Sequence, residues 1–208
     1  MKGKLIAICG IDGSGKSTLL KNLEKYYDIK LNSAYIKMFY NPIFTNELEE
    51  VAHKFNIERR ECFSNSLRSV IWMDDLIYNY YRYIEPELEK EKIVFVDRYT
   101  ICNEVYTICM AKGYINQMFK IYNTLKKPDL LIYLDVNEEI AVDRIKKRKI
   151  VAPYENRETL KELKKLYEEK IKEADYSIYR INADLSETRV LENVVNVIDG
   201  FLQGIKIK

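Results

Sequence analysis

The chain has 208 residues, 47% of them hydrophobic and 32% charged, a composition that favours one globular domain over residues 1–208. A formal net charge of +2 offers little attraction for a nucleic-acid polymer or an anionic membrane. No apolar run reaches the roughly 18 residues that cross a bilayer, and the run at residues 5–9 is too short for a signal-peptide core. We therefore expect a cytoplasmic protein with small-molecule partners.

Five short apolar segments predict the strands of a buried parallel sheet, because strands covered on both faces are continuously apolar. In chain order they are residues 5–9, 34–39, 93–96, 130–134 and 176–181. Helical periodicity between and after them predicts helices at residues 16–27, 65–90, 103–111, 138–149, 157–172 and 187–202. This alternation predicts an α/β protein of three layers, α/β/α, with a five-stranded parallel sheet and ligands beyond the carboxyl ends of the strands.

A glycine-rich sequence follows the first predicted strand. Residues 10–17 match the pattern G-x-x-x-x-G-K-[ST] of the P-loop. Its glycines let successive backbone N–H groups face one anion, and the next helix directs its positive end there. Lys16 can reach the β- and γ-phosphates, and the Ser17 hydroxyl can coordinate Mg²⁺. The loop predicts a nucleoside triphosphate site formed by Gly10, Asp12, Gly13, Ser14, Gly15, Lys16, Ser17 and Thr18.

The third predicted strand ends in Asp97-Arg98-Tyr99. A carboxylate at a strand end beside the P-loop strand is placed to hold Mg²⁺ or its water shell, and the planar guanidinium of Arg98 can clamp a phosphate. The N-K-x-D sequence with which switch GTPases read guanine does not occur in the chain. These features favour a small-molecule kinase with a P-loop kinase fold.

The loop and the Asp97-Arg98-Tyr99 element resemble those of the thymidylate kinase family, and the similarity extends along nearly the whole chain. Residues 128–136 resemble the family's fourth strand. Arg144 and Arg148 resemble the start of its lid, expected at about residues 146–157, and residues 153–156 resemble the lid's far end. The resemblance implies transfer of the ATP γ-phosphoryl group to dTMP with Mg²⁺, through positioning and electrostatics, and it implies a homodimer.

The resemblance also implies roles for single residues. Lys16, Arg98 and Arg148 are the expected catalytic residues, with Arg98 on the acceptor phosphate. Ser17 and Asp97 would serve Mg²⁺, and Arg144 would stack on adenine. The residues expected to contact the acceptor are Asp12, Phe39, Trp72, Arg98, Tyr106 and Tyr154.

The sequence departs from the family at two positions near the acceptor phosphate. Cys9 stands where the family has a glutamate, and residues 39–43 lack the arginine and glutamate that usually flank the proline there. Arg68, Arg59 or Arg60 can supply the missing phosphate contact, and we expect Arg68 in the acceptor site. The alternative for these arginines is a solvated basic face.

A third departure concerns the acceptor base. Trp72 falls where the family stacks a phenylalanine on thymine, but the arginine one turn later is replaced by Leu76 or Ile77. Asp74 and Asp75 lie beside this position, and a carboxylate accepts hydrogen bonds from an exocyclic amine. We therefore hypothesise an acceptor base other than thymine; the alternative is a shifted register with both aspartates solvated.

Two other functions remain open from the sequence. A deoxynucleoside kinase needs a carboxylate base after the second strand, where Asn41-Pro42 supplies none. A nucleotide-binding protein with a different or lost activity is the second alternative. The remaining chemistry-bearing residues are expected to be structural: His53 on a surface helix, and buried thiols at Cys9, Cys62, Cys102 and Cys109.

Overall fold

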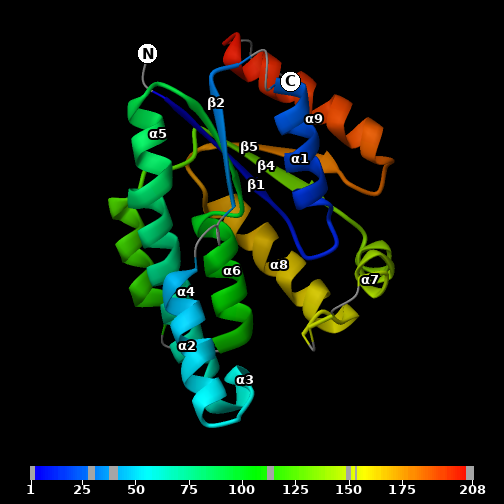
Figure 1. The fold of residues 1–208 in the computed structure, drawn as a ribbon. Helices are drawn as coiled ribbons and strands as arrows, with labels where there is room; N and C mark the ends of the chain where they lie inside the picture. Colours follow the sequence, from blue (N-terminus) through cyan, green and yellow to red (C-terminus); the bar gives the residue numbers. More distant parts are fainter. Residues whose placement is uncertain are drawn as a thin grey trace.

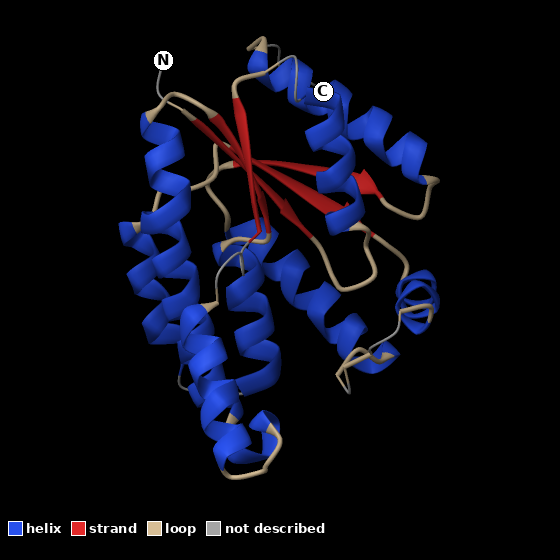
Figure 2. Cartoon of the chain, viewed as in Figure 1, coloured by secondary structure: helices blue, strands red, loops and turns tan. Residues whose placement is uncertain are grey.

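The computed structural model describes residues 3–27, 31–37, 42–111, 115–148, 151–152 and 154–204. Within these residues one parallel sheet has the strand order β2-β3-β1-β4-β5 (Figure 2). The strands are β1 (Lys4–Cys9), β2 (Ser33–Lys37), β3 (Ile93–Asp97), β4 (Leu130–Asp135) and β5 (Ser177–Asn182). The five-stranded parallel sheet is confirmed; residues 38–39 of the second predicted strand lie outside the described part of the chain.

The three central strands form the middle of the hydrophobic core. The apolar residues of β1 from Leu5 to Cys9 are completely buried, and those of β4 from Leu130 to Leu134 are almost so. The edge strand β5 remains partly exposed. Continuous burial on both faces explains why the central strands are unbroken apolar runs in the sequence.

Helices cover both faces of the sheet (Figure 1). On one face α1 (Lys16–Tyr27) packs beside α9 (Glu187–Leu202), where the Tyr27 hydroxyl donates a 2.6 Å hydrogen bond to Asp199. The other face carries α4 (Asn65–Asn79), α5 (Glu85–Glu89), α6 (Thr100–Ala111) and α8 (Arg157–Glu173). This arrangement confirms the three-layer α/β/α class. No helix in the described part of the chain is long and apolar enough to cross a membrane.

The helix bounds differ from the sequence-based ones in a few places. Helix α6 begins three residues before the predicted start, and α7 (Glu138–Lys146) ends three residues before the predicted end. The predicted helix over residues 65–90 is interrupted by a π-helical turn, Tyr80–Ile84, between α4 and α5. Pro86 explains this turn. Its backbone nitrogen carries no hydrogen to donate to the carbonyl oxygen four residues earlier, and its ring would collide with that carbonyl group.

In the described part of the chain, three helical segments have no counterpart among the predicted helices. They are α2 (Ile43–Lys54), the short helix α3 (Arg59–Cys62) and the 3₁₀ segment Ile115–Thr124. His53 lies in α2 with its side chain exposed, as expected for a surface helix residue. Helices α2 and α3 form the end of the helical layer farthest from the sheet (Figure 1).

Candidate functional site

The glycine-rich loop between β1 and α1 is pressed against two other elements. Gly13 has φ +81° and Gly10 has φ +148°, backbone conformations that residues with a side chain rarely adopt. A Cβ atom on Gly13 would lie 2.5 Å from the carbonyl oxygen of Ala141 in α7, and one on Gly10 would lie 2.7 Å from that of Leu134. The loop therefore requires glycine at both positions to curl in this space.

Lys16 fills the inside of the loop. Its ammonium group donates hydrogen bonds to the carbonyl oxygens of Gly10 (2.9 Å) and Ile11 (2.7 Å) and to the Ser14 hydroxyl (3.2 Å). Burial, together with repulsion from the positive charge of Arg98, lowers the pKa of Lys16 to about 8. The lysine is therefore a buried cation inside the loop that is expected to cradle phosphates.

Asp97 meets the loop because β3 runs beside β1 with Asp97 opposite Ile8. The Ser17 hydroxyl donates a 3.0 Å hydrogen bond to Oδ2 of Asp97. Oδ1 of Asp97 is buried and has no hydrogen-bond partner in the described part of the chain. An oxygen left in this state suits a hard cation, since Mg²⁺ binds through one or two carboxylates and retains several waters. Ser17 and Asp97 thus fit the expected metal ion.

Arg98 is held toward the loop by its backbone and by an ion pair. It has φ +71°, and its N–H donates to the carbonyl oxygen of Ile8 at 2.9 Å, which continues the β1–β3 ladder. Its guanidinium group forms an ion pair with Asp12 and lies 4.8 Å from the ring centre of Tyr106. A left-handed non-glycine residue is often found at functional sites, where surrounding contacts maintain the strain.

Asp12 joins Arg98 to Tyr106. The Tyr106 hydroxyl donates a 2.9 Å hydrogen bond to Oδ2 of Asp12. Burial opposes ionisation of this carboxyl group, but Arg98, Lys16 and the Tyr106 hydroxyl outweigh it and lower the pKa of Asp12. Asp12 is therefore an anion that orients Arg98.

Two cavities adjoin the loop. A cavity of about 310 Å³ is lined by the residues Asp12, Gly13, Gly15, Lys16, Ser17, Thr18, Asp97, Arg98 and Arg148. A second cavity, of about 450 Å³, shares Gly13, Gly15, Thr18 and Arg148 with it. Because they share these residues, the two cavities are neighbours along the loop and the first turn of α1.

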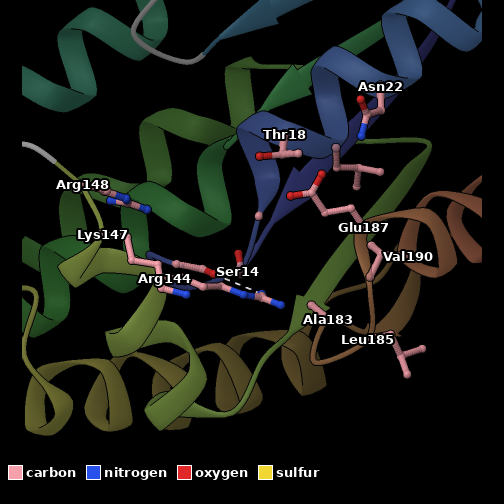
Figure 3. A pocket seen from close by; sticks show the side chains of 13 residues that line it. Ser14, Thr18, Asn22, Arg144, Lys147, Arg148, Ala183, Leu185, Glu187 and Val190 are labelled. Atoms are coloured by element: carbon pink, nitrogen blue, oxygen red, sulfur yellow. Dashed lines mark hydrogen bonds between the residues drawn. The ribbon is translucent and has the colours of Figure 1, made fainter.

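The larger cavity lies between α7 and the segment that follows β5 (Figure 3). Figure 3 shows Arg144, Lys147 and Arg148 on one side and Leu185, Glu187 and Val190 on the other. The guanidinium group of Arg144 lies 3.4 Å from the carbonyl oxygen of Gly13. The sequence analysis named Arg144 and Arg148 but missed the residues after β5. The only available signal was that ligands bind beyond strand ends, and it does not specify residues.

Arg148 also connects the two described ends of the expected lid. Its guanidinium group pairs with Glu155 at 2.8 Å, and the other oxygen of Glu155 accepts the Ala152 N–H at 2.6 Å. Residues 149–150 and 153, within the predicted lid, lie outside the described part of the chain.

Tyr154, one of the residues expected to contact the acceptor, lies near Asp12. Its pKa is raised by burial and by the negative charge of Asp12, so the two side chains are close enough to interact. The guanidinium carbon of Arg60 lies 5.1 Å from the ring centre of Tyr154. The structure thus brings Tyr154 within interaction range of Asp12 and Arg98 and places Arg60 beside it. Phe39 lies outside the described residues.

Of the two carboxylates expected beside the acceptor base, Asp75 is not available to a ligand. Asp75 is fully buried, and it accepts hydrogen bonds from the N–H groups of Phe44 (2.9 Å) and Thr45 (3.0 Å) and from the Thr45 hydroxyl (2.5 Å). It therefore caps α2, whose N-cap residue Pro42 has no side-chain acceptor. The reading of Asp75 as an acceptor for a base amine is corrected, as is the alternative that it is solvated; only Asp74 is exposed.

The cysteines differ in their burial. Cys9 and Cys102 are buried with their sulfur atoms 2.7 Å apart, and Cys109 is also buried. Cys62 is partly exposed, so the prediction of a buried thiol is wrong there. None of the four forms a disulfide bond among the described residues. Cys9 occupies the position just before the loop where the resemblance implied a glutamate.

Comparisons with known proteins agree with this geometry. The family model described as thymidylate kinase matches residues 8–194. A probable thymidylate kinase of Archaeoglobus fulgidus is 30% identical over 95% of this chain and 96% of its own. Probable thymidylate kinase 1 of Saccharolobus solfataricus is 31% identical over 94% and 96%. A thymidylate kinase of Leptospira interrogans is 29% identical over 96% and 94%.

Proposed function

Because the chain belongs to the thymidylate kinase family, we propose that it transfers the γ-phosphoryl group of ATP to a deoxynucleoside 5′-monophosphate, with dTMP as the reference acceptor. The protein is a nucleoside monophosphate kinase of the thymidylate kinase type. The observation that carries the mechanism is the convergence of Lys16, Asp97 and Arg98 on one cavity of about 310 Å³.

The donor occupies both cavities in this proposal. The triphosphate lies in the smaller cavity against the loop N–H groups, and the adenosine lies in the larger one beside Arg144. Lys16 releases its carbonyl partners and donates to the β- and γ-phosphates, because a charged phosphate attracts the ammonium group more strongly than a neutral carbonyl does. Arg148 lines both cavities, which supports a role for it beside the transferring group.

The Ser17–Asp97 pair would hold the magnesium ion, with Oδ1 of Asp97 as the free carboxylate oxygen. A bound Mg²⁺ would supply positive charge that stabilises the negative charge developing during phosphoryl transfer. Asp97 is fixed by its strand position opposite Ile8, so little reorganisation is needed when nucleotide binds.

The acceptor lies on the other side of Lys16, where Arg98 clamps its phosphate and Asp12 accepts a hydrogen bond from its sugar. The ion pair with Asp12 orients the Arg98 guanidinium before the acceptor arrives. A monophosphate is already a nucleophilic anion, so no general base is required. The lowered pKa of Asp12 agrees with this, because it keeps the carboxylate ionised and makes it a weak general base.

We also propose a cytoplasmic homodimer, since ATP and deoxynucleotides are available there and family members commonly pair through helices beside the long helix. Leu76 on α4 is fully buried in the core and does not contribute to such an interface. Leu67 on α4 is an exposed apolar residue that is available to it. Analytical ultracentrifugation tests the proposal: a single species of about 25 kDa at micromolar concentration would rule out the dimer.

A panel of acceptors tests the activity. ADP formation and nucleotide products are measured with dTMP, dUMP, dCMP, dGMP, dAMP and thymidine in the presence of ATP and Mg²⁺. We expect a nucleoside diphosphate and ADP in equal amounts from a monophosphate, and a loss of at least about 100-fold for Lys16→Met. Phosphorylation of thymidine alone would indicate a deoxynucleoside kinase, and no product with any acceptor would defeat the proposal.

A further inference from the structure

Two buried thiols meet at the start of the glycine-rich loop. Cys9 is the last residue of β1, just before Gly10, and Cys102 lies in the first turn of α6. Their sulfur atoms lie 2.7 Å apart, and both side chains are almost completely buried. Two sulfur atoms this close need only a short movement to form a covalent bond. The pair therefore offers a reaction that the proposed phosphoryl transfer does not use.

The two thiols differ in how readily they ionise. Burial raises the pKa of Cys9, and the hydrogen bond that it shares with Cys102 and the charge of Cys102 raise it further. Burial also opposes ionisation of Cys102. The shared hydrogen bond, the positive charge of Arg98 and a hydrogen bond with Tyr167 outweigh this opposition and lower the pKa of Cys102. Since the thiolate is the nucleophilic form, Cys102 is the attacking sulfur and Cys9 is its partner.

Arg98 connects the thiol pair to the smaller cavity. It lines that cavity, and its guanidinium group is close enough to Cys102 for their charges to interact. A hydroperoxide is little larger than water and can enter a cavity of about 310 Å³. Cysteines beside cationic groups are the ones that oxidise selectively. The position of Cys102 therefore favours its reaction with an oxidant that reaches the cavity.

We propose that Cys9 and Cys102 form a redox-active dithiol, which a hydroperoxide converts into an intramolecular disulfide that disables the glycine-rich loop. The Cys102 thiolate attacks one oxygen of hydrogen peroxide, the O–O bond breaks, and the departing hydroxide takes up a proton to become water. The Cys9 sulfur then attacks the sulfenic acid on Cys102, and its thiol proton leaves with the hydroxyl group as a second water. The two sulfur atoms lose two electrons, which the peroxide gains. A dithiol reductant breaks the disulfide by exchange.

A disulfide at this place would disturb the part of the loop that holds Lys16. The carbonyl oxygen of Gly10, next to Cys9, accepts hydrogen bonds from Lys16 at 2.9 Å and from the Tyr167 hydroxyl at 3.4 Å. Gly10 is also packed tightly against β4, so the loop cannot absorb a shift of Cys9 without moving these contacts. A displacement of about 1 Å in a catalytic site can lower a rate about 100-fold. The loss of activity rests on the proposed function, whereas formation of the disulfide does not.

Mass spectrometry and kinetics of the full-length folded protein test the proposal. After the reductant is removed, the protein is treated with hydrogen peroxide and digested without reduction. We expect the intact protein to lose the mass of two hydrogen atoms, and the digest to contain a peptide pair joined through Cys9 and Cys102. The rate of ADP formation with ATP, Mg²⁺ and dTMP should fall at least about tenfold and return after addition of dithiothreitol.

Three variants assign the effect to the pair. Cys102→Ser removes the attacking sulfur, so it should form no disulfide, and its own rate should not change on treatment. If this variant fails to fold, as judged by circular dichroism, Cys9→Ala tests the loss of the joined peptide instead. Cys62→Ser, which removes a partly exposed thiol on α3, is the matched control and should respond to peroxide as the unmodified protein does.

The outcomes separate this inference from the proposed function. Absence of the joined peptide in the unmodified protein overturns the inference, as does a joined peptide with an unchanged rate. An equal loss of rate in Cys102→Ser overturns it as well, because the sensitive group would then lie elsewhere. If the protein transfers no phosphoryl group, the proposed function fails, but the digest still decides whether the disulfide forms. Calorimetric titration with ATP then decides its effect on the loop, since oxidation should weaken the affinity.

Discussion

Lys16 combines full burial with a role that requires a positive charge. Its pKa of about 8 in the free protein means that the ammonium form is lost as pH rises through that value. We predict that kcat/KM for ATP falls above about pH 8, because this parameter reports the ionisation of the free enzyme. The decline in kcat should occur at higher pH, since the negative charge of bound phosphates raises the pKa of Lys16.

Initial rates between pH 7 and 10 at limiting and saturating ATP measure both profiles. A kcat/KM that stays constant up to pH 9.5 would contradict the role of burial and Arg98 in weakening the lysine's proton affinity.

Two carboxylates at strand ends allow a matched comparison of metal binding. Asp97 forms no ion pair among the described residues and is bonded by the Ser17 hydroxyl, whereas Asp135 pairs with Lys164 and Arg180, each at 2.9 Å. Asp97→Asn removes the charge that would hold Mg²⁺, so the Mg²⁺ concentration for half-maximal activity should rise by at least about tenfold. Asp135→Asn should leave it unchanged. Titration of Mg²⁺ at fixed ATP measures both, and equal shifts in the two variants would contradict the assignment of Asp97.

Residues within the loop could be assigned from the sequence because the pattern specifies both identity and spacing. Lys16, Ser17 and Asp97 converge in the structure as the sequence analysis expected. Asp75 could not be assigned in this way. Its partners, Phe44 and Thr45, lie about 30 residues earlier, and their contact depends on how α2 packs against α4.

Helix α2 depends on a cap supplied by another helix. The Asp75 carboxylate satisfies the first N–H groups of α2 and is completely buried. We predict that Asp75→Ala lowers the free energy of unfolding by about 2 kcal/mol, because the buried donors lose their acceptor. Asp74→Ala, at the exposed neighbouring position, should change it by less than about 0.5 kcal/mol.

Urea denaturation monitored by circular dichroism measures both variants. Equal destabilisation by the two substitutions would show that Asp75 is an ordinary helix residue and that the capping role is wrong.

The elements that sequence patterns predicted well are those whose environment is uniform along their length. Strands β1 and β4 are buried on both faces, so their apolar runs are unambiguous. The interruption of the long helix was not predicted, because a proline inside helical periodicity indicates a disturbance but not its form. Here the helix continues through a π-helical turn before Pro86. Helix α2 was missed because Pro42 replaces the usual capping residue.

At the scale of the whole molecule, the site is assembled by the order of the parallel strands. The loop after β1 lies between the ends of β3 and β4, which bring Asp97 from one side and Arg144, through α7, from the other. Residues after β5, including Glu187, complete the larger cavity. Motifs mark the first two segments in the sequence. No motif marks the third, because its place in the site follows only from β5 pairing with β4.

The central claim is that this assembly moves a phosphoryl group from ATP to a nucleoside monophosphate. ³¹P nuclear magnetic resonance of ATP, Mg²⁺ and dTMP during turnover observes every phosphorus-containing species at once. We predict that the signals of dTDP and ADP grow in equal amounts with the unmodified protein and not with Lys16→Met. Inorganic phosphate appearing with ADP while dTMP remains unchanged would contradict the claim, because the γ-phosphoryl group would then be passing to water.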